Sequence, residues 1–163
     1  MVLLPALIIV FVLGFVLGKF YYGLDDKADV DLDKNITAEI KEDNLEEECK
    51  MVFAVNQSLK MGKGKIGAQV AHACLGSFKQ AVAQCPEVVH HWELTGQTKV
   101  CVKVPDDEEL TALYERVRSA GLPCCLIRDA GRTQIAASSK TAVGIGPLPI
   151  SIINDYTGHY KLL

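Results

Sequence analysis

The sequence lacks several features that would assign it to a class at once. Aromatic residues are only 7% of the 163 residues, with one tryptophan, so little favours a module that stacks single-stranded RNA on exposed rings. The six cysteines include no C-x-x-C pair and no histidine at zinc-ligand spacing, and Cys124 and Cys125 are adjacent. Neither a zinc module nor a secreted disulfide framework is indicated, and we expect reduced thiols packed as small apolar side chains.

A glycine-rich stretch, KMGKGKIGAQVAHA at 60–73, contains G-x-G-x-x-G at Gly62, Gly64 and Gly67. In a dinucleotide-binding turn the first glycine follows a strand directly, and an acid about twenty residues later ends a second strand. Here NQSLKM separates the preceding strand from the glycines, and Glu87, at that distance, falls at a predicted helix start. The G-x-x-x-x-G-K-[ST] pattern of a P-loop has no match around Gly62 either. Both patterns therefore fail, and we expect no nucleotide cofactor.

The first 18 residues, MVLLPALIIVFVLGFVLG, carry no charge and are followed by Lys19 and three aromatics. A membrane-spanning helix needs about 20 apolar residues with aromatic and basic residues at its ends. We predict a retained anchor over 1–23 rather than a signal peptide, because no basic residue precedes the run and no small-x-small cleavage site follows it. Lys19 and Lys27 lie after the span, which predicts that the rest of the chain faces the cytosol.

Charge divides the chain into two parts. Residues 1–49 hold eleven acidic and four basic side chains, whereas 50–163 hold nine acidic and thirteen basic ones. The stretch 24–48 has few large apolar residues, so we predict an acidic flexible linker there. The mildly basic remainder is compatible with a polyanionic partner.

The remaining pattern predicts a single α/β domain over 49–163. Asp106 and Glu109 form a candidate capping box, and Leu110, Leu113 and Val117 give the helix that follows one apolar stripe. The predicted order is strand, helix, helix, strand, helix, strand, strand, at 51–55, 65–84, 86–94, 99–104, about 107–120, 124–130 and 142–147. This order implies a small mixed four-stranded sheet flanked by helices on both faces.

One candidate site lies on the helix after the glycines. Lys65, Gln69 and His72 are spaced i, i+4 and i+7 and project from one side, with Lys60 and Lys63 nearby. Lys65 falls in the first helical turn, where backbone N–H groups attract phosphate or oxyanions. The alternatives are a solvated face for the lysine and the glutamine, and a hydrogen-bonded core histidine. The predicted inward side consists of Ile66, Val70, Ala73 and Ser77.

A second candidate is RDAGRTQI, in which Asp129 ends a predicted strand and Thr133 follows four residues later. Ligands of open α/β sheets gather at the carboxyl ends of strands, which favours a polar site. A turn in which Asp129 bonds its own backbone is the equal alternative.

Four blocks in order, KMGKGKIGAQVAHA, DAGRTQIA, TAVGIGP and TGHYKLL, resemble the peptidyl-tRNA hydrolase type 2 family of archaea and eukaryotes. Gly67 departs from the usual alanine or valine in the first block, which removes no functional group. The resemblance implies hydrolysis of the ester joining a peptide to the 3′ ribose of tRNA, without cofactor or metal, by a homodimer. The apolar N-terminus and acidic linker resemble members anchored to mitochondria, which implies the outer membrane with the domain in the cytosol.

The resemblance also implies a set of active-site residues in this chain: Lys65, Gln69, His72, Asp129, Thr133 and Thr141. In this hypothesis Asp129 polarises Thr133 or a water, and Lys65 stabilises the oxyanion or holds the terminal phosphate. Gln69 and His72 are positioning residues. The side chains expected to line a track for the tRNA backbone are Lys60, Lys63, Arg132 and Lys140. The alternative function is a membrane-tethered adaptor with the same fold that acts through protein partners in apoptosis signalling.

Overall fold

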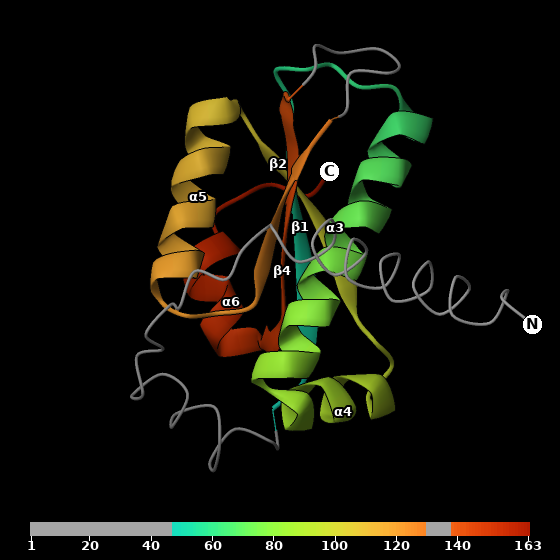
Figure 1. Ribbon diagram of the computed structural model, residues 1–163, viewed down its shortest axis with the longest axis vertical. Coiled ribbons are helices and arrows are strands. Elements are labelled where there is room, and N and C mark those ends of the chain that lie inside the picture. Colours follow the sequence, from blue (N-terminus) through green and yellow to red (C-terminus); the bar gives the residue numbers. More distant parts are fainter. Residues whose placement is uncertain (1–46, 130–137) are drawn as a thin grey trace, which may run out of the picture. The chain divides into compact units, whose positions relative to one another are not determined.

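The computed structural model describes residues 47–129 and 138–163 (Figure 1). The predicted anchor and nearly all of the predicted linker lie outside these residues, as do Arg132 and Thr133. Among the helices that the structure describes, none combines the length and the apolar character needed to span a membrane.

Four strands and four helices make up the described domain. They are β1 (Cys49–Asn56), α3 (Lys63–Gln84), α4 (Pro86–Leu94), β2 (Lys99–Val104), α5 (Asp107–Ser119), β3 (Cys124–Arg128), β4 (Lys140–Pro149) and α6 (Ile150–Thr157). The sheet order is β2-β1-β4-β3, with β1 parallel to β2 and β4 antiparallel to both β1 and β3. Figure 1 shows α3 and α4 on one face of the sheet and α5 and α6 on the other. The predicted α/β class and mixed sheet are confirmed.

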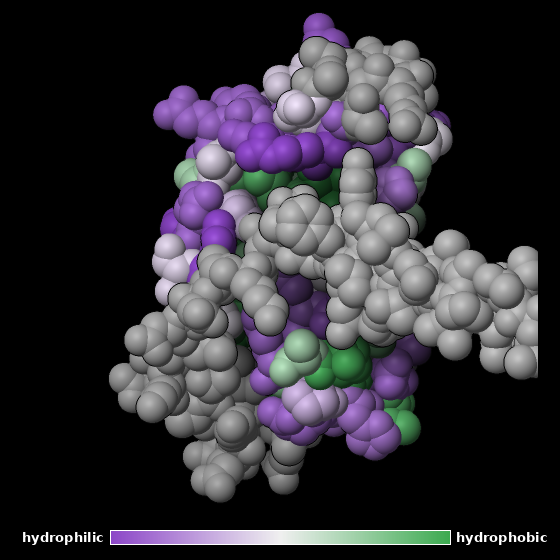
Figure 2. Space-filling view, in the orientation of Figure 1, coloured by the Kyte–Doolittle hydropathy of each residue, from purple (hydrophilic) through white to green (hydrophobic). Residues whose placement is uncertain are grey.

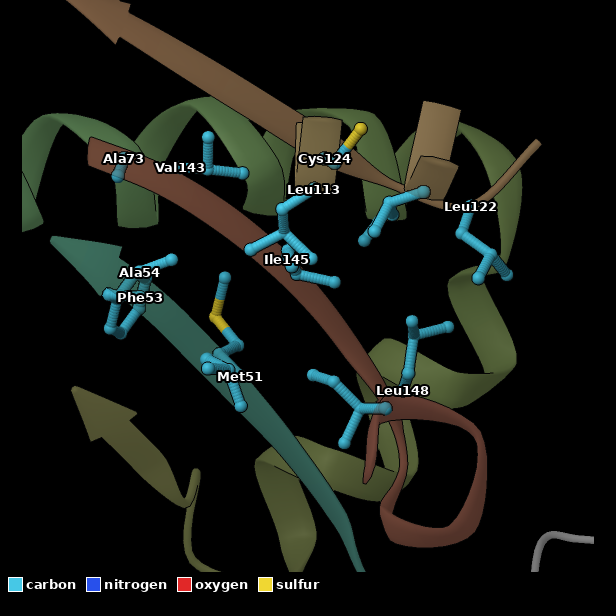
Figure 3. Packing of buried hydrophobic residues seen from close by; sticks show 14 of the residues in the cluster. Met51, Phe53, Ala54, Ala73, Leu113, Leu122, Cys124, Val143, Ile145 and Leu148 are labelled. Atoms are coloured by element: carbon cyan, nitrogen blue, oxygen red, sulfur yellow. The ribbon is translucent and has the colours of Figure 1, made fainter. Parts of the chain in front are cut away.

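The core lies on both faces of β1 and β4. Met51 to Val55 of β1 are at most 1% exposed, as expected for a continuous apolar strand covered on both sides. The stripe predicted on α5, Leu110, Leu113 and Val117, is fully buried. Figure 3 shows Leu113 packed near Ile145 of β4, with Met51 of β1 below them. These contacts fix the sheet whose carboxyl ends carry the candidate site.

The helix α6 was not predicted from the sequence. It begins directly after β4, because Pro149 is both the last strand residue and the N-cap, and no loop separates the two elements. Its first turn is capped from far along the chain: the carboxylate of Glu47 accepts hydrogen bonds from the backbone N–H and the hydroxyl of Ser151, at 2.8 and 2.6 Å. A cap that comes from a distant residue leaves no local sequence signal.

All six cysteines are free thiols, as predicted. Cys49, Cys85 and Cys124 are buried in the core cluster. Burial raises the pKa of Cys49 to about 11 and the pKa of Cys85 and Cys124 to about 12, so these thiols are neutral at physiological pH.

Candidate active site

The carboxylate of Asp129 meets the ammonium of Lys65 at the end of the sheet. Lys65 Nζ lies 2.6 Å from Asp129 Oδ1, and each side chain is 9% exposed. Lys65 belongs to the first turn of α3, and Asp129 directly follows β3. The two predicted candidate sites therefore form one buried, charged centre at a strand's carboxyl end.

The backbone of Asp129 is held in place by the chain that leads into β4. Its N–H donates to the carbonyl of Ser139 at 2.9 Å, and its carbonyl accepts from the N–H of Ser138 at 2.7 Å. These bonds extend the β3–β4 pairing past the last strand residue. The Asp129 side chain is thus fixed by the sheet on one side and by α3 on the other.

Gln69 and Thr141 form a second pair one helical turn away. The hydroxyl of Thr141 donates to Gln69 Oε1 at 2.6 Å and also lies 3.2 Å from the Ile127 carbonyl, with both side chains at most 5% exposed. A regular strand would point Thr141 to the face opposite Gly144, three residues later, which lies against Ala73 of α3. The register shift between Ile127 and Arg128 makes Thr141 the extra residue of a bulge, which turns its side chain toward α3.

The buried side of α3 differs from the predicted one. It consists of Gln69, Ala73, Ser77 and Ala81, a column with a spacing of four. Ile66 and Val70, predicted to face inward, are half-buried, and Gln69, whose alternative was a solvated face, lies in the inward column. The reason is packing: small residues let α3 approach β4 so closely that a Cβ on Gly144 would stand 2.5 Å from the Ala73 carbonyl oxygen.

His72 lies outside this centre. Its side chain is exposed, so it is not the core histidine that the sequence left as an alternative. Its spacing of seven from Lys65 gives it nearly the same direction around α3 as Lys65, beside the inward column, but two turns further along the helix that direction is open to solvent. The predicted set of three is therefore divided into two buried residues and one exposed residue.

The predicted tRNA-contacting lysines have different surroundings. Lys60 and Lys63 are exposed at the entrance to α3. Lys140 instead forms an ion pair and a hydrogen bond within the protein. Its ammonium lies 3.0 Å from Asp107 Oδ2 and 2.7 Å from the hydroxyl of Thr111. In the view of Figure 2, hydrophilic residues dominate the upper part of the described surface, over the end of the sheet that holds the candidate site.

Asn56 was missed as a site residue by the sequence analysis. This buried side chain donates to the Lys140 carbonyl at 3.1 Å and accepts from the N–H and hydroxyl of Ser58 at 3.0 and 2.7 Å. It lines an open pocket of about 340 Å³ together with Ser58, Leu59, Asp107, Ser138, Ser139 and Lys140. The available signal was N-x-S directly after a strand, a common turn pattern.

Comparison with known proteins shows the family to which the chain belongs. The family model described as "Peptidyl-tRNA hydrolase PTH2" matches residues 49–163. The human protein named "Peptidyl-tRNA hydrolase 2, mitochondrial" is 50% identical over 115 residues, 71% of this chain and 64% of that protein. The mouse protein of the same name is 42% identical over 146 residues, 90% of this chain and 80% of its own length.

An archaeal relative matches the folded domain almost end to end. The protein named "Peptidyl-tRNA hydrolase" from Methanocaldococcus jannaschii is 47% identical over 114 residues, which cover 70% of this chain and 99% of that protein. The matched region thus spans less than two thirds of the human relative and nearly all of the archaeal one. The chain belongs to the PTH2 family of peptidyl-tRNA hydrolases.

Proposed function

We propose that this chain hydrolyses the ester bond between the peptide and the 3′ ribose of peptidyl-tRNA and so recycles tRNA from prematurely released peptidyl-tRNA. The observation that carries the proposal is the buried Lys65–Asp129 pair, 2.6 Å apart, in a domain that matches the family over 49–163. Ester hydrolysis needs a nucleophile that gives up a proton and a donor where negative charge develops on the carbonyl oxygen. A carboxylate can accept the proton of the attacking water or hydroxyl, and an ammonium at the same place can donate to the carbonyl oxygen.

Asp129 is the acceptor of the proton. Its carboxylate is fixed between α3 and the β3–β4 pairing, so it can orient a water or the hydroxyl of Thr133 for attack on the ester carbonyl. Lys65 has three N–H donors, of which one is directed at Asp129 Oδ1. In this proposal a second donor of the same ammonium turns to the developing oxyanion or to the terminal phosphate of the tRNA when the substrate binds.

Gln69, Thr141 and His72 complete the proposed site as positioning residues. The Thr141–Gln69 bond joins α3, one turn from Lys65, to β4, the strand that pairs with β3, and so fixes the spacing between α3 and the end of the sheet that carries Asp129. With its Oε1 occupied by Thr141, the Gln69 amide nitrogen can donate to the substrate. His72 is on the exposed side, where it is placed to contact the tRNA rather than the ester.

The tRNA backbone is proposed to bind along Lys60, Lys63, Arg132 and Lys140. Exposed lysines near the first turn of α3 supply positive charge next to the N-terminal end of that helix, a combination that favours phosphate. Binding through such contacts releases counterions and weakens as the salt concentration rises.

The proposal extends to the location of the protein. The human and mouse relatives are named mitochondrial, and residues 1–18 of this chain are uncharged and strongly apolar. We place the anchor at 1–23 in the mitochondrial outer membrane and the catalytic domain at 49–163 in the cytosol, joined by the linker 24–48. Protease treatment of intact mitochondria should remove the domain, and protection of the domain would overturn this topology.

We also propose that the chain is a homodimer through its folded domain. Leu75 and Val82 lie seven residues apart on α3 and are 54% and 47% exposed, which supports an apolar contact on the outer side of that helix. Equilibrium sedimentation of the full chain should give twice the monomer mass. A monomer mass at micromolar concentration would contradict the proposal.

The direct test of the function is release of peptide from peptidyl-tRNA by the full chain. We expect turnover by the wild type and a loss of at least about a hundredfold in Lys65→Ala and Asp129→Asn. Lys79→Ala and Asp155→Asn remove exposed groups of the same charge and should keep the wild-type rate. Absence of release by the folded wild-type chain would overturn the proposal and favour the adaptor function instead.

A further inference from the structure

The outer edge of β3 is a free edge of the sheet that leads directly to Asp129. β3 is the last strand in the order β2-β1-β4-β3 and pairs only with β4. The N–H of Gly146 in β4 donates to the carbonyl of Pro123, so every second residue from Pro123 directs its backbone groups toward β4. By the same alternation, Cys124, Leu126 and Arg128 direct their N–H and C=O groups away from the sheet.

Only the beginning of this outer edge is covered by a described side chain. Gln80 Oε1 accepts the N–H of Cys124 at 3.2 Å. For the backbone groups of Leu126 and Arg128 that point outward, the described part of the chain provides no hydrogen-bond partner. We call these outward N–H and C=O groups of Leu126 and Arg128 the β3 edge.

The opposite edge of the sheet, along β2, is covered in part by the C-terminal residues. Along β2, the N–H of Lys103 donates to the carbonyl of Lys161 at 2.8 Å, and the N–H of Leu163 donates to the carbonyl of Cys101 at 3.0 Å. The C-terminal residues thus pair with β2 through an antiparallel bridge between Val102 and Leu162. An open strand edge presents N–H and C=O groups that can pair with another extended chain. An open edge beside the candidate active site is therefore suited to bind an extended segment of the substrate.

We propose that the β3 edge binds the peptide portion of peptidyl-tRNA as an added strand, which delivers the ester to Lys65 and Asp129. The inference rests on the proposed function and names a subsite of it. Main-chain pairing suits this substrate because it does not depend on side chains, and stalled peptides differ in sequence. The β3 edge is continuous with Asp129 in the chain, so a bound strand ends at the reacting pair.

The direction of the added strand follows from the chemistry. The esterified residue is the C-terminal residue of the peptide, and it must lie next to Asp129, which follows the C-terminal end of β3. The peptide therefore runs parallel to β3. With the esterified residue opposite Asp129, parallel pairing directs the N–H of the third residue from the ester to the Leu126 carbonyl, and the N–H of the second residue away from the edge.

N-methylation of the peptide backbone tests this pairing with the wild-type enzyme. Two peptidyl-tRNAs of identical sequence would carry an N-methyl group on the second or on the third residue from the ester. We expect kcat/KM to fall about fivefold for the N-methyl group on the third residue and to stay at the parent value for the one on the second. Equal rates for both methylated substrates, whether lowered or not, would overturn the proposal, whereas hydrolysis of the parent substrate would still support the proposed function.

A second test removes a donor from the enzyme. Leu126→Pro deletes an N–H that points away from β4, and proline is tolerated at such edge positions. Leu126→Ala keeps the N–H and is the matched control. For Leu126→Pro we expect kcat/KM on a pentapeptidyl-tRNA to fall about fivefold. On an N-acetylaminoacyl-tRNA we expect kcat/KM to stay at the wild-type value. This shorter substrate cannot reach Leu126, so its rate reports whether the variant is folded. A loss on both substrates together, or on neither, would contradict the β3 edge as a peptide site.

Discussion

Thr141 donates its hydroxyl hydrogen to Gln69 Oε1 at 2.6 Å, and both side chains are almost completely buried between β4 and α3. A buried amide that loses its partner keeps its desolvation cost, so the bond matters more when one side of it is removed than its net strength indicates. The pair lies one turn from Lys65 and is therefore placed to hold the reacting groups in register.

Thr141→Val removes the hydroxyl with little change in shape. We expect the free energy of unfolding in urea to fall by about 1–3 kcal/mol, because Gln69 Oε1 is left without a donor. The double variant Gln69→Leu/Thr141→Val should lose clearly less than the sum of the two single changes. Thr157→Val is the control, since that buried hydroxyl donates only to a carbonyl of its own helix. Additive losses in the double variant would show that the two side chains are not coupled.

Two glycines should respond to alanine in opposite ways. A Cβ on Gly67 meets nothing within 4 Å, so Gly67→Ala should raise the free energy of unfolding by up to about 1 kcal/mol through helix propensity. A Cβ on Gly144 would stand 2.5 Å from the Ala73 carbonyl oxygen, and Gly144→Ala should cost about 1–3 kcal/mol. Urea unfolding measures both, and a neutral Gly144→Ala would contradict the close approach of α3 to β4.

The lysines of the proposed tRNA track are not equivalent. Lys63 is exposed, whereas Lys140 already lies within hydrogen-bond distance of Asp107 and Thr111. Lys63→Ala should reduce the slope of log affinity against log salt concentration by roughly 1, the effect of losing one phosphate contact. Lys140→Ala should change this slope less, because its charge is partly compensated within the protein. Filter binding of peptidyl-tRNA at several salt concentrations distinguishes the two, and equal slopes would contradict this ranking.

The buried thiols predict how stability depends on alkaline pH. Burial raises the pKa of Cys85 and Cys124 to about 12 from an ordinary value of 9.0, so the folded state keeps protons that the unfolded state loses. Their contribution to stability is complete below the unfolded pKa and is lost as pH rises toward the folded pKa. Urea unfolding at about pH 8, 9 and 10 should show falling stability, with a shallower fall in Cys85→Ala/Cys124→Ala. Stability that stays constant over this range would contradict the shift.

Much of the fold could be predicted because local sequence and tertiary environment agree. The apolar run of β1 is buried on both faces, and Asp106 caps α5 by accepting the N–H of Glu109 at 2.9 Å. The reverse half of the predicted capping box differs: Glu109 Oε1 accepts the hydroxyl of Tyr160 at 2.5 Å. The Glu109 carboxylate, which the capping-box pattern predicts to accept a backbone N–H at the helix start, thus accepts a hydrogen bond from a residue distant in the sequence.

In the candidate site, too, the features that depend on local sequence could be predicted and those that depend on another strand could not. The spacing of Lys65 and Gln69 placed both on one side of α3, and the position of Asp129 at a strand end was readable from the apolar residues before it. The buried state of Gln69 was not readable, since it depends on the bulge at Thr141 and on Gly144, which come from another strand. Helix periodicity gives relative directions around α3, but the packing against β4 sets which direction faces inward.

The central claim is that Lys65 and Asp129 act together on the ester, and a double-mutant cycle in single-turnover hydrolysis of peptidyl-tRNA tests it most directly. The full chain, Lys65→Met, Asp129→Asn and the double variant would be compared with enzyme in excess. Two groups that work as one unit give single losses of about a hundredfold or more, and a double variant no slower than the worse single variant. Wild-type turnover in either single variant, or losses that multiply in the double variant, would contradict the account.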